Sequence, residues 1–163
     1  MKGLNNKGFT LVEVLAVIVI LSILVAIMVP TTSHLIQMNK ESNYENLGKT
    51  FKSMAKGYLS DNRYEIVLSD TCNASDNTKD IKSIRGKSLV NSHLPISWLV
   101  DDGYVKVGKD GNIINPLDST KKLKLVGNDE DDTTVSYVLV KYQCNSKEFS
   151  VELETSSLIW VDK

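Results

Sequence analysis

The feature that most constrains this chain is an apolar run close to its N-terminus. From Val14 to Val29 the sequence reads VLAVIVILSILVAIMV, sixteen residues in which Ser22 alone is polar. Extending the run back to Phe9 admits a single charge, that of Glu13. A helix of this length spans about 30 Å, the thickness of the hydrocarbon core of a bilayer. The run therefore predicts a membrane-inserted helix.

The residues on either side of the run set its expected orientation and processing. Lys2 and Lys7 precede it with no acidic residue between them, which predicts a cytoplasmic leader and an outward C-terminal part. A secretory signal peptide needs a small-residue cleavage site after its apolar stretch, and Val29-Pro30-Thr31 offers none. We therefore do not expect cleavage on that side of the run.

The segment before the run carries a different processing signal. Residues 7–13 read KGFTLVE and closely resemble the cleavage motif of type IV prepilins. The resemblance implies that a dedicated membrane peptidase cuts after Gly8 and N-methylates the new terminal residue, Phe9. Glu13 then becomes the fifth mature residue and matches the glutamate that most such pilins carry. The resemblance is specific over Lys7 to Pro30 and only architectural beyond it.

Glu13 is the costly residue of this segment. A carboxylate at mid-membrane costs about 2.5–3.5 kcal/mol on insertion scales, so it is read as functional and needs a partner. We expect that partner to be the freed amine of Phe9, either in the same helix or, by family precedent, in a neighbouring subunit, where the pair selects register. The alternative is that Glu13 snorkels to the interface from an uncleaved anchor.

The helix is expected to continue from Phe9 to Leu59. Pro30 lacks an amide proton and predicts a kink, at a position that matches the proline of the family. Beyond it an apolar seam recurs every three or four residues, at Tyr44, Leu47, Phe51, Met54 and Tyr58. The expected segments are a leader at 1–8, a transmembrane and polymerisation helix at 9–30, its amphipathic half at 31–59 and a globular head at 60–163.

In the head we expect an antiparallel sheet. Residues 60–92 read as a polar loop with one short strand at 64–68, and residues 94–100 as a short helix that Gly103 stops. Alternating apolar residues and short apolar runs predict strands at 123–126, 135–140, 149–154 and 158–161, with a brief one at 113–114. Together these give an α+β pilin architecture, a long helix packed on about four antiparallel strands.

Composition excludes several functional classes. Nineteen basic residues stand against twenty acidic ones, so no basic field favours a nucleic-acid partner. His34 and His93 are isolated, and the sequence has no glycine-rich phosphate loop and no CxxC pair. We expect neither an enzyme nor a cofactor.

The two cysteines are separated by 72 residues. Cys72 and Cys144 both lie in the part expected outside the cytoplasm, where a disulfide can form. Such a bond would tie the loop after the helix to a strand of the sheet. In many pilins the disulfide instead encloses a C-terminal segment, so the chain departs from the family pattern here.

One dense acidic cluster, at residues 129–132, raises the question of calcium. Asp129, Asp131 and Asp132 are the candidate ligands, since some related secretion pseudopilins bind this ion. The spacing does not fit an EF-hand loop, and four adjacent acids cannot all face one ion. We favour a solvated turn and expect no metal.

The resemblance implies a structural subunit of a type IV pilus, polymerising with other pilin subunits into a cell-surface filament for adhesion, motility or aggregation. It implies a prepilin peptidase, an assembly ATPase and a platform membrane protein as partners. The precursor would sit in the cytoplasmic membrane and the mature chain in an extracellular pilus. The alternatives are a pseudopilin of a type II secretion or competence DNA-uptake system and an uncleaved membrane-anchored binding protein.

Overall fold

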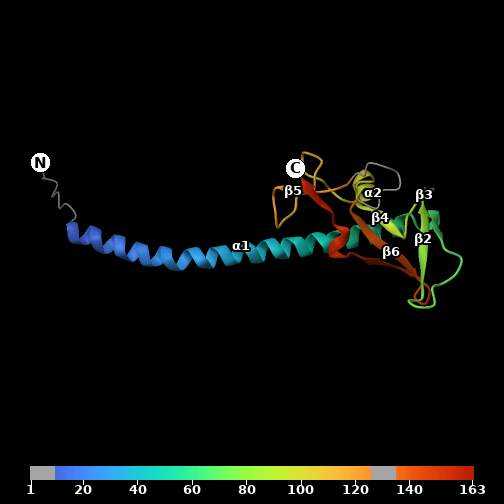
Figure 1. The fold of residues 1–163 in the computed structure, drawn as a ribbon, viewed down its shortest axis with the longest axis horizontal. Coiled ribbons are helices and arrows are strands. Elements are labelled where there is room, and N and C mark those ends of the chain that lie inside the picture. Colours follow the sequence, from blue (N-terminus) through green and yellow to red (C-terminus); the bar gives the residue numbers. More distant parts are fainter. Residues whose placement is uncertain (1–9, 126–134) are drawn as a thin grey trace, which may run out of the picture. The chain divides into compact units, whose positions relative to one another are not determined.

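A computed structural model of the chain describes residues 10–125 and 135–163, without the side chains of 29–31 and 155. The elements appear in Figure 1. They are α1 (Leu11–Asp61), η1 (Arg63–Glu65), β1 (Ile66–Leu68), β2 (Thr78–Ile84), β3 (Lys87–Ser88), β4 (His93–Pro95), α2 (Ile96–Asp101), β5 (Lys121–Leu123), β6 (Tyr137–Gln143), β7 (Glu148–Glu152), η2 (Thr155–Ser157) and β8 (Trp160–Asp162).

The chain divides into two compact units, 1–40 and 41–163. In the first unit the described residues form the N-terminal part of α1. Its backbone stays helical through Pro30, and a kink at this position remains a prediction. Two hydroxyls here bond back to the carbonyl one turn earlier, Ser22 to Ile18 at 2.7 Å and Thr32 to Met28 at 2.9 Å. Such bonds let a polar side chain sit in an apolar surrounding without an outside partner.

The second unit, which we call the head, is built around β6. One edge of β6 pairs with β2 at residues 141–143 and with β4 at residues 137–139, and its other edge pairs along its length with β7. β1 and β3 join this sheet through β2, and all pairings are antiparallel. β5 and β8 form a separate two-stranded sheet.

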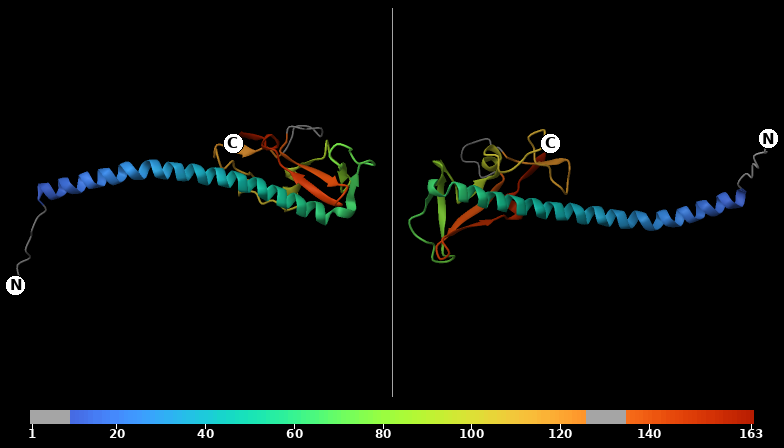
Figure 2. Two further views of the ribbon diagram at one scale, coloured as in Figure 1. Left: turned by 90° about the horizontal axis from the view of Figure 1, so that it is seen from below. Right: turned by 180° about the vertical axis from the view of Figure 1, so that it is seen from behind.

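The core of the head lies between the C-terminal part of α1 and the main sheet. The helix contributes Phe51, Ala55, Tyr58 and Leu59, none more than 1 % exposed. The sheet and α2 supply most of the facing side chains, at Ile81, Ile84, Leu94, Ile96, Leu99, Val138, Val140 and Val151. Figure 2 shows the strands running beside this part of α1 in both views. The predicted α+β class, a long helix on an antiparallel sheet, is confirmed.

Several boundaries differ from the sequence-based expectation. Residues 60–92, expected to be a loop with one strand, contain β1, β2 and β3, and Tyr64 lies in η1 rather than in a strand. The sequence did not indicate β2 because only two of its residues, Ile81 and Ile84, are apolar. Its third buried residue is the polar Thr78. The described residues therefore hold eight strands in two sheets, and Ile113–Ile114 supplies only a bridge from Ile114 to Lys122.

The short helix in the head agrees with its prediction. α2 begins after Pro95 and ends at Asp101. Gly103 then takes a φ of +78°, a left-handed conformation that favours glycine over residues with a side chain, and the chain leaves the helix there. Residues expected as a strand at 158–161 begin their ladder at Trp160.

Candidate assembly site

The N-terminal end of α1 is closed by a reciprocal pair of side chains. The backbone N–H of Thr10 donates to Oε2 of Glu13 at 2.8 Å, and the Thr10 hydroxyl donates to the same oxygen at 2.9 Å. In return, the backbone N–H of Glu13 donates to the Thr10 hydroxyl oxygen at 3.3 Å. This is a capping box, in which two side chains satisfy donors that the first turn of a helix leaves unpaired.

The capping box changes the reading of Glu13. Sequence reasoning named the amine of Phe9 as its partner and missed Thr10, although a threonine three residues before a glutamate at the start of an apolar run is the signature of this motif. Gly8 and Phe9 lie outside the described residues, so the Glu13–Phe9 pair stays a prediction. Two hydrogen bonds to one carboxylate oxygen reduce the cost of placing that charge at an apolar helix end.

The rest of the first unit is apolar on every side. Every leucine, isoleucine, valine and methionine from Leu11 to Met28 is 46–81 % exposed. A helix that is apolar all round needs a surrounding of lipid or of other apolar helices, because water does not solvate it favourably. An 18-residue window of α1 has a mean hydropathy of 3.1, and by length and composition it can cross a membrane.

Beyond this apolar stretch the helix surface changes character. Leu35, Ile36 and Met38 are still 52–56 % exposed, but they alternate with polar residues such as His34 and Lys40. An ion pair of Glu45 with Lys49 at 2.8 Å follows at i,i+4 spacing. The hydrogen bond and charge of Lys49 lower the pKa of the Glu45 carboxyl. The described surface suited to lipid or helix partners therefore thins out beyond Met38.

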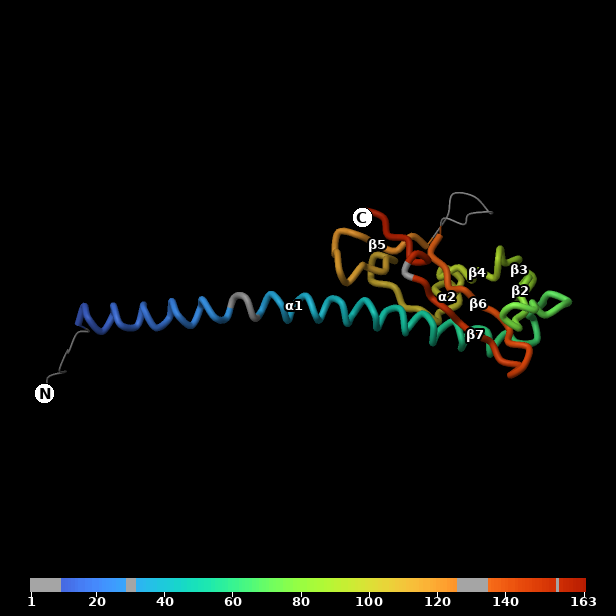
Figure 3. The backbone as a smooth tube through the Cα atoms, turned by 60° about the horizontal axis from the view of Figure 1, so that its bottom comes forward, coloured from blue at the N-terminus to red at the C-terminus, as the bar shows by residue number. Residues whose placement is uncertain are grey.

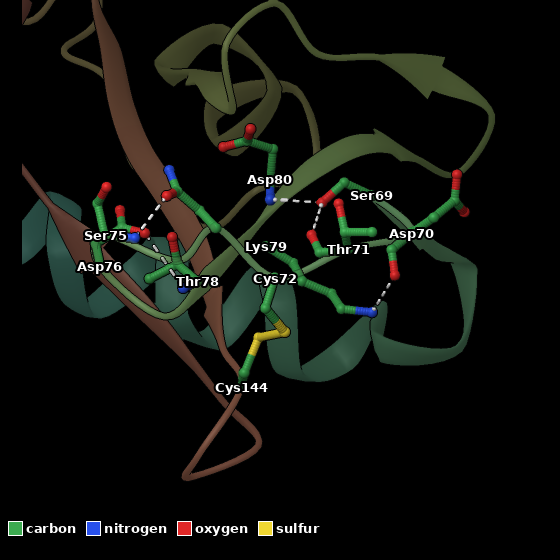
Figure 4. The surroundings of a disulfide bond; sticks show 11 residues. Ser69, Asp70, Thr71, Cys72, Ser75, Asp76, Thr78, Lys79, Asp80 and Cys144 are labelled. Carbon is green, nitrogen blue, oxygen red and sulfur yellow. Dashed lines mark hydrogen bonds between the residues drawn. A yellow bond between two sulfur atoms is a disulfide. The ribbon is translucent and has the colours of Figure 1, made fainter.

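In the head, Cys72 and Cys144 form a disulfide with their Cα atoms 6.6 Å apart (Figure 4). The bond joins the loop between β1 and β2 to the turn between β6 and β7. A backbone bond from the Cys144 N–H to the Asn77 carbonyl, 3.0 Å long, runs beside it. The loop that sequence reasoning read as irregular is thus fixed to the sheet.

Polar contacts hold the same loop on either side of the disulfide. Lys141 on β6 lies 2.6 Å from Asp76, and their hydrogen bond raises the pKa of Lys141 and lowers that of Asp76. Lys79 donates to the Asp70 carbonyl at 3.1 Å, and the Asp80 N–H donates to the Ser69 hydroxyl at 3.1 Å (Figure 4). The loop is therefore an ordered surface of the head.

The remaining candidate groups do not build a catalytic arrangement in the described residues. His93 stacks on Tyr137, with ring centroids 3.7 Å apart, and burial lowers its pKa although the charge of Glu154 opposes this. Within 10–125 and 135–163 no three His, Cys, Asp or Glu side chains gather as metal ligands. The calcium candidates Asp129, Asp131 and Asp132 lie outside the described residues.

The comparisons with known proteins bear on the N-terminal segment. A family model described as the prokaryotic N-terminal methylation motif matches residues 3–29, which cover most of the leader and the apolar run up to the residue before Pro30. No curated protein and no solved structure matches the chain. Through residues 3–29 the chain carries the N-terminal methylation motif, the signature of type IV pilins and their prepilin precursors.

Proposed function

We propose that this chain is a structural subunit of a type IV pilus, cut after Gly8 and assembled through α1 into a cell-surface filament. One observation carries the proposal: the described N-terminal part of α1 is apolar on every side and is broken near its start by one capped carboxylate, that of Glu13. The methylation motif that covers this stretch marks a pilin-like or pseudopilin class of structural protein rather than an enzyme.

Assembly through α1 follows from what can cover its surface. In the membrane, lipid chains surround the apolar residues of the precursor. Outside the membrane, only the same surface of other subunits offers an equally apolar cover, so helices pack side by side in the centre of a fibre. The heads have their own core and need no such cover.

Glu13 gives this packing a register. After cleavage, the amine of Phe9 is a cation that stands in an apolar surrounding unless an anion meets it. Thr10 holds Oε2 of Glu13, so the other oxygen of the carboxylate is a positioned acceptor for such an amine in a neighbouring subunit. A subunit displaced along the fibre would leave both charges unpaired, which is costly in an apolar core.

The proposed partners are those that this life cycle requires. A prepilin peptidase must remove residues 1–8, and the cytoplasmic membrane holds the precursor until it does. An assembly ATPase and a platform membrane protein then supply the work of extracting an apolar helix from lipid. Adhesion, motility and aggregation are the roles proposed for the finished filament.

A pseudopilin of a secretion or DNA-uptake system is the second candidate, because the match at residues 3–29 covers only features that both classes share. The two differ in the fibre they build. Immunogold labelling of the head on intact cells would show long surface fibres for a pilus subunit. A label confined to short, envelope-bound structures would contradict the proposal of a pilus subunit and favour that of a pseudopilin.

An uncleaved membrane-anchored binding protein is the third reading. Deleting the prepilin peptidase distinguishes this candidate from the other two. A chain that is normally cleaved then keeps residues 1–8 and migrates more slowly on a gel, whereas the mobility of an uncleaved anchor does not change. Glu13→Ala should abolish recovery of the chain in sheared filaments while leaving its amount in the membrane unchanged. Glu148→Ala, at an exposed carboxylate on β7, is the matched control and should leave filaments at the original level.

A further inference from the structure

A groove runs along the head between α1 and the chain that follows β7. It encloses about 300 Å³, and its lining residues are Glu41, Tyr44, Glu45, Gly48, Lys49, Lys52, Leu153, Glu154 and Leu158. Figure 3 shows β7 and the chain beyond it lying alongside this part of the helix. Gly48 makes the approach close, because a Cβ at this position would lie 3.2 Å from Cδ2 of Leu153. The uncharged lining residues are Tyr44, Gly48, Leu153 and Leu158.

The groove is lined by charges of both signs, with Glu41, Glu45, Lys49 and Lys52 on the helix and Glu154 beyond β7. Lys52 stands on the helix side and Glu154 on the side of the strand. Neither makes an ion pair in the described part of the chain, whereas the neighbouring Glu45 and Lys49 pair with each other. Lys52 and Glu154 therefore offer a cation and an anion to an occupant that carries an apolar group between two charges.

The head displays such a group at the end of α1. Tyr64, in η1, is 100 % exposed, which is unusual for an aromatic side chain in a folded domain. Arg63 precedes it and Glu65 follows it, and both are exposed. The guanidinium of Arg63 makes one long bond, 3.4 Å to the Lys147 carbonyl, and neither charge forms an ion pair in the described residues.

Tyr64 cannot reach the groove of its own molecule. The last helix residue that lines the groove is Lys52, and the helix continues to Asp61 before η1 begins, which separates the two surfaces by about 14 Å at 1.5 Å per residue. Any contact between them would have to join two copies. In copies that point the same way, as in a filament, two different surfaces displaced along the helix axis meet in a contact that repeats without closing.

We propose that Tyr64 of one copy docks in the groove of a second copy, with Arg63 facing Glu154 and Glu65 facing Lys52. The contact rests on the proposed function and adds to that function a specific contact between the heads of two subunits in the filament. The apolar helices supply most of the buried area, and this contact selects which heads become neighbours. Exposed tyrosines that enter a pocket are often the residues on which an interface depends most.

The test is a charge reversal with rescue in the full-length chain, expressed in its own cells. Lys52→Glu and Glu65→Lys should each lower the sheared filament yield about fivefold or more, because like charges then face each other. The double variant restores opposite charges and should return the yield to within about twofold of the unaltered chain. Lys56→Glu, exposed on the same helix but outside the groove, is the matched control.

Tyr64→Ala and Tyr64→Phe test the aromatic ring itself. The alanine variant should lose about tenfold in filament yield and the phenylalanine variant should keep most of it. Because Tyr64 is fully exposed, neither change should disturb the head, and formation of the Cys72–Cys144 disulfide in each variant checks this on a gel.

The outcomes separate this contact from the proposed function. If the unaltered chain forms no filament, the proposed pilus function and the Tyr64 contact are both wrong. If it forms filaments and the Tyr64 and charge variants match it, the contact alone is wrong. A defect in Lys52→Glu that Glu65→Lys does not rescue would mean that the groove takes another occupant, and it would overturn the pairing proposed here.

Discussion

Thr10 offers both of its donors, the backbone N–H and the side-chain hydroxyl, to the same oxygen of Glu13, at 2.8 and 2.9 Å. The two residues thereby close the first turn of α1 at the point where an apolar helix begins. The arrangement fixes one oxygen of the carboxylate and leaves the other for a further partner. The charge of Glu13 is costly in lipid, and the hydrogen bonds from Thr10 hold this anion in a defined position.

The first prediction separates the hydroxyl of Thr10 from its backbone donor. Thr10→Ala removes the hydroxyl and should cost the helix end about 1 kcal/mol, as the loss of a capping side chain does. Filament yield should fall in Thr10→Ala and stay near the original level in Thr10→Ser, which keeps the hydroxyl. Quantitative blotting of sheared filaments measures both. Equal yields for the two variants would show that the cap does not position Glu13.

The second prediction concerns the disulfide. Closing a loop of 72 residues lowers the conformational entropy of the unfolded chain, which raises the free energy of unfolding by about 4 kcal/mol. Cys72→Ser, Cys144→Ser and the double variant should therefore lower the free energy of unfolding by a similar amount, measured by denaturant titration of the full chain in detergent. A reducing agent should bring the unaltered protein to the same value. Additive losses in the double variant would contradict a shared bond.

The third prediction concerns Ser136, which is fully buried between the two sheets. Its hydroxyl accepts from the Ile159 N–H at 2.9 Å and lies 3.2 Å from the Ile159 carbonyl, to which it donates. Ser136→Ala leaves both groups without this partner and should cost about 1–3 kcal/mol of stability. Ser156→Ala, at an exposed serine, should change the stability by less than about 0.5 kcal/mol. Equal effects of the two changes would contradict this role.

The fourth prediction is a pH dependence. The hydroxyl of Tyr104 donates to Asp61 at 2.6 Å, and this bond, with smaller contributions from burial and nearby charges, raises the pKa of Tyr104 to about 12. Because the pKa is raised in the folded chain, the bond stabilises the fold fully below the ordinary pKa of 10, and this is lost as the pH rises toward 12.

Tyrosinate absorbance measures that titration, and the difference between the original chain and Tyr104→Phe isolates this residue. Asp61→Asn should bring the pKa of Tyr104 back toward 10, since the anionic acceptor is lost. Burial also raises the pKa of Tyr58, so Asp61→Asn is compared with the double variant that adds Tyr104→Phe. A late titration of Tyr104 that persists in this difference would contradict the assignment to Asp61.

The parts of the fold that could be predicted are those with a strong periodic signal. The long apolar run and the seam from Tyr44 to Tyr58 predict one helix, and its observed end at Asp61 is two residues beyond the expected one. Gly103 marks the end of the short helix correctly, because its positive φ is a conformation that favours glycine. These signals are local, so they survive without knowledge of the tertiary structure.

The parts that could not be predicted depend on contacts between distant residues. β2 is held in place by Ser92, whose buried hydroxyl accepts from the Ile81 N–H at 2.9 Å, with Ser92 itself at a φ of +59°. No local pattern announces such a bond. For Glu13 a local pattern was present: Thr10 lies three residues before it, which is the spacing of a capping box. The resemblance to pilins predicted the amine of Phe9 as its partner instead.

The central claim, that the chain is processed and polymerised as a pilus subunit, is tested most directly by mass spectrometry of the protein sheared from the cell surface. Cleavage and methylation at this motif predict a chain that begins at Phe9 with an N-methyl group. Surface-exposed protein that still carries Met1 to Gly8 would contradict it.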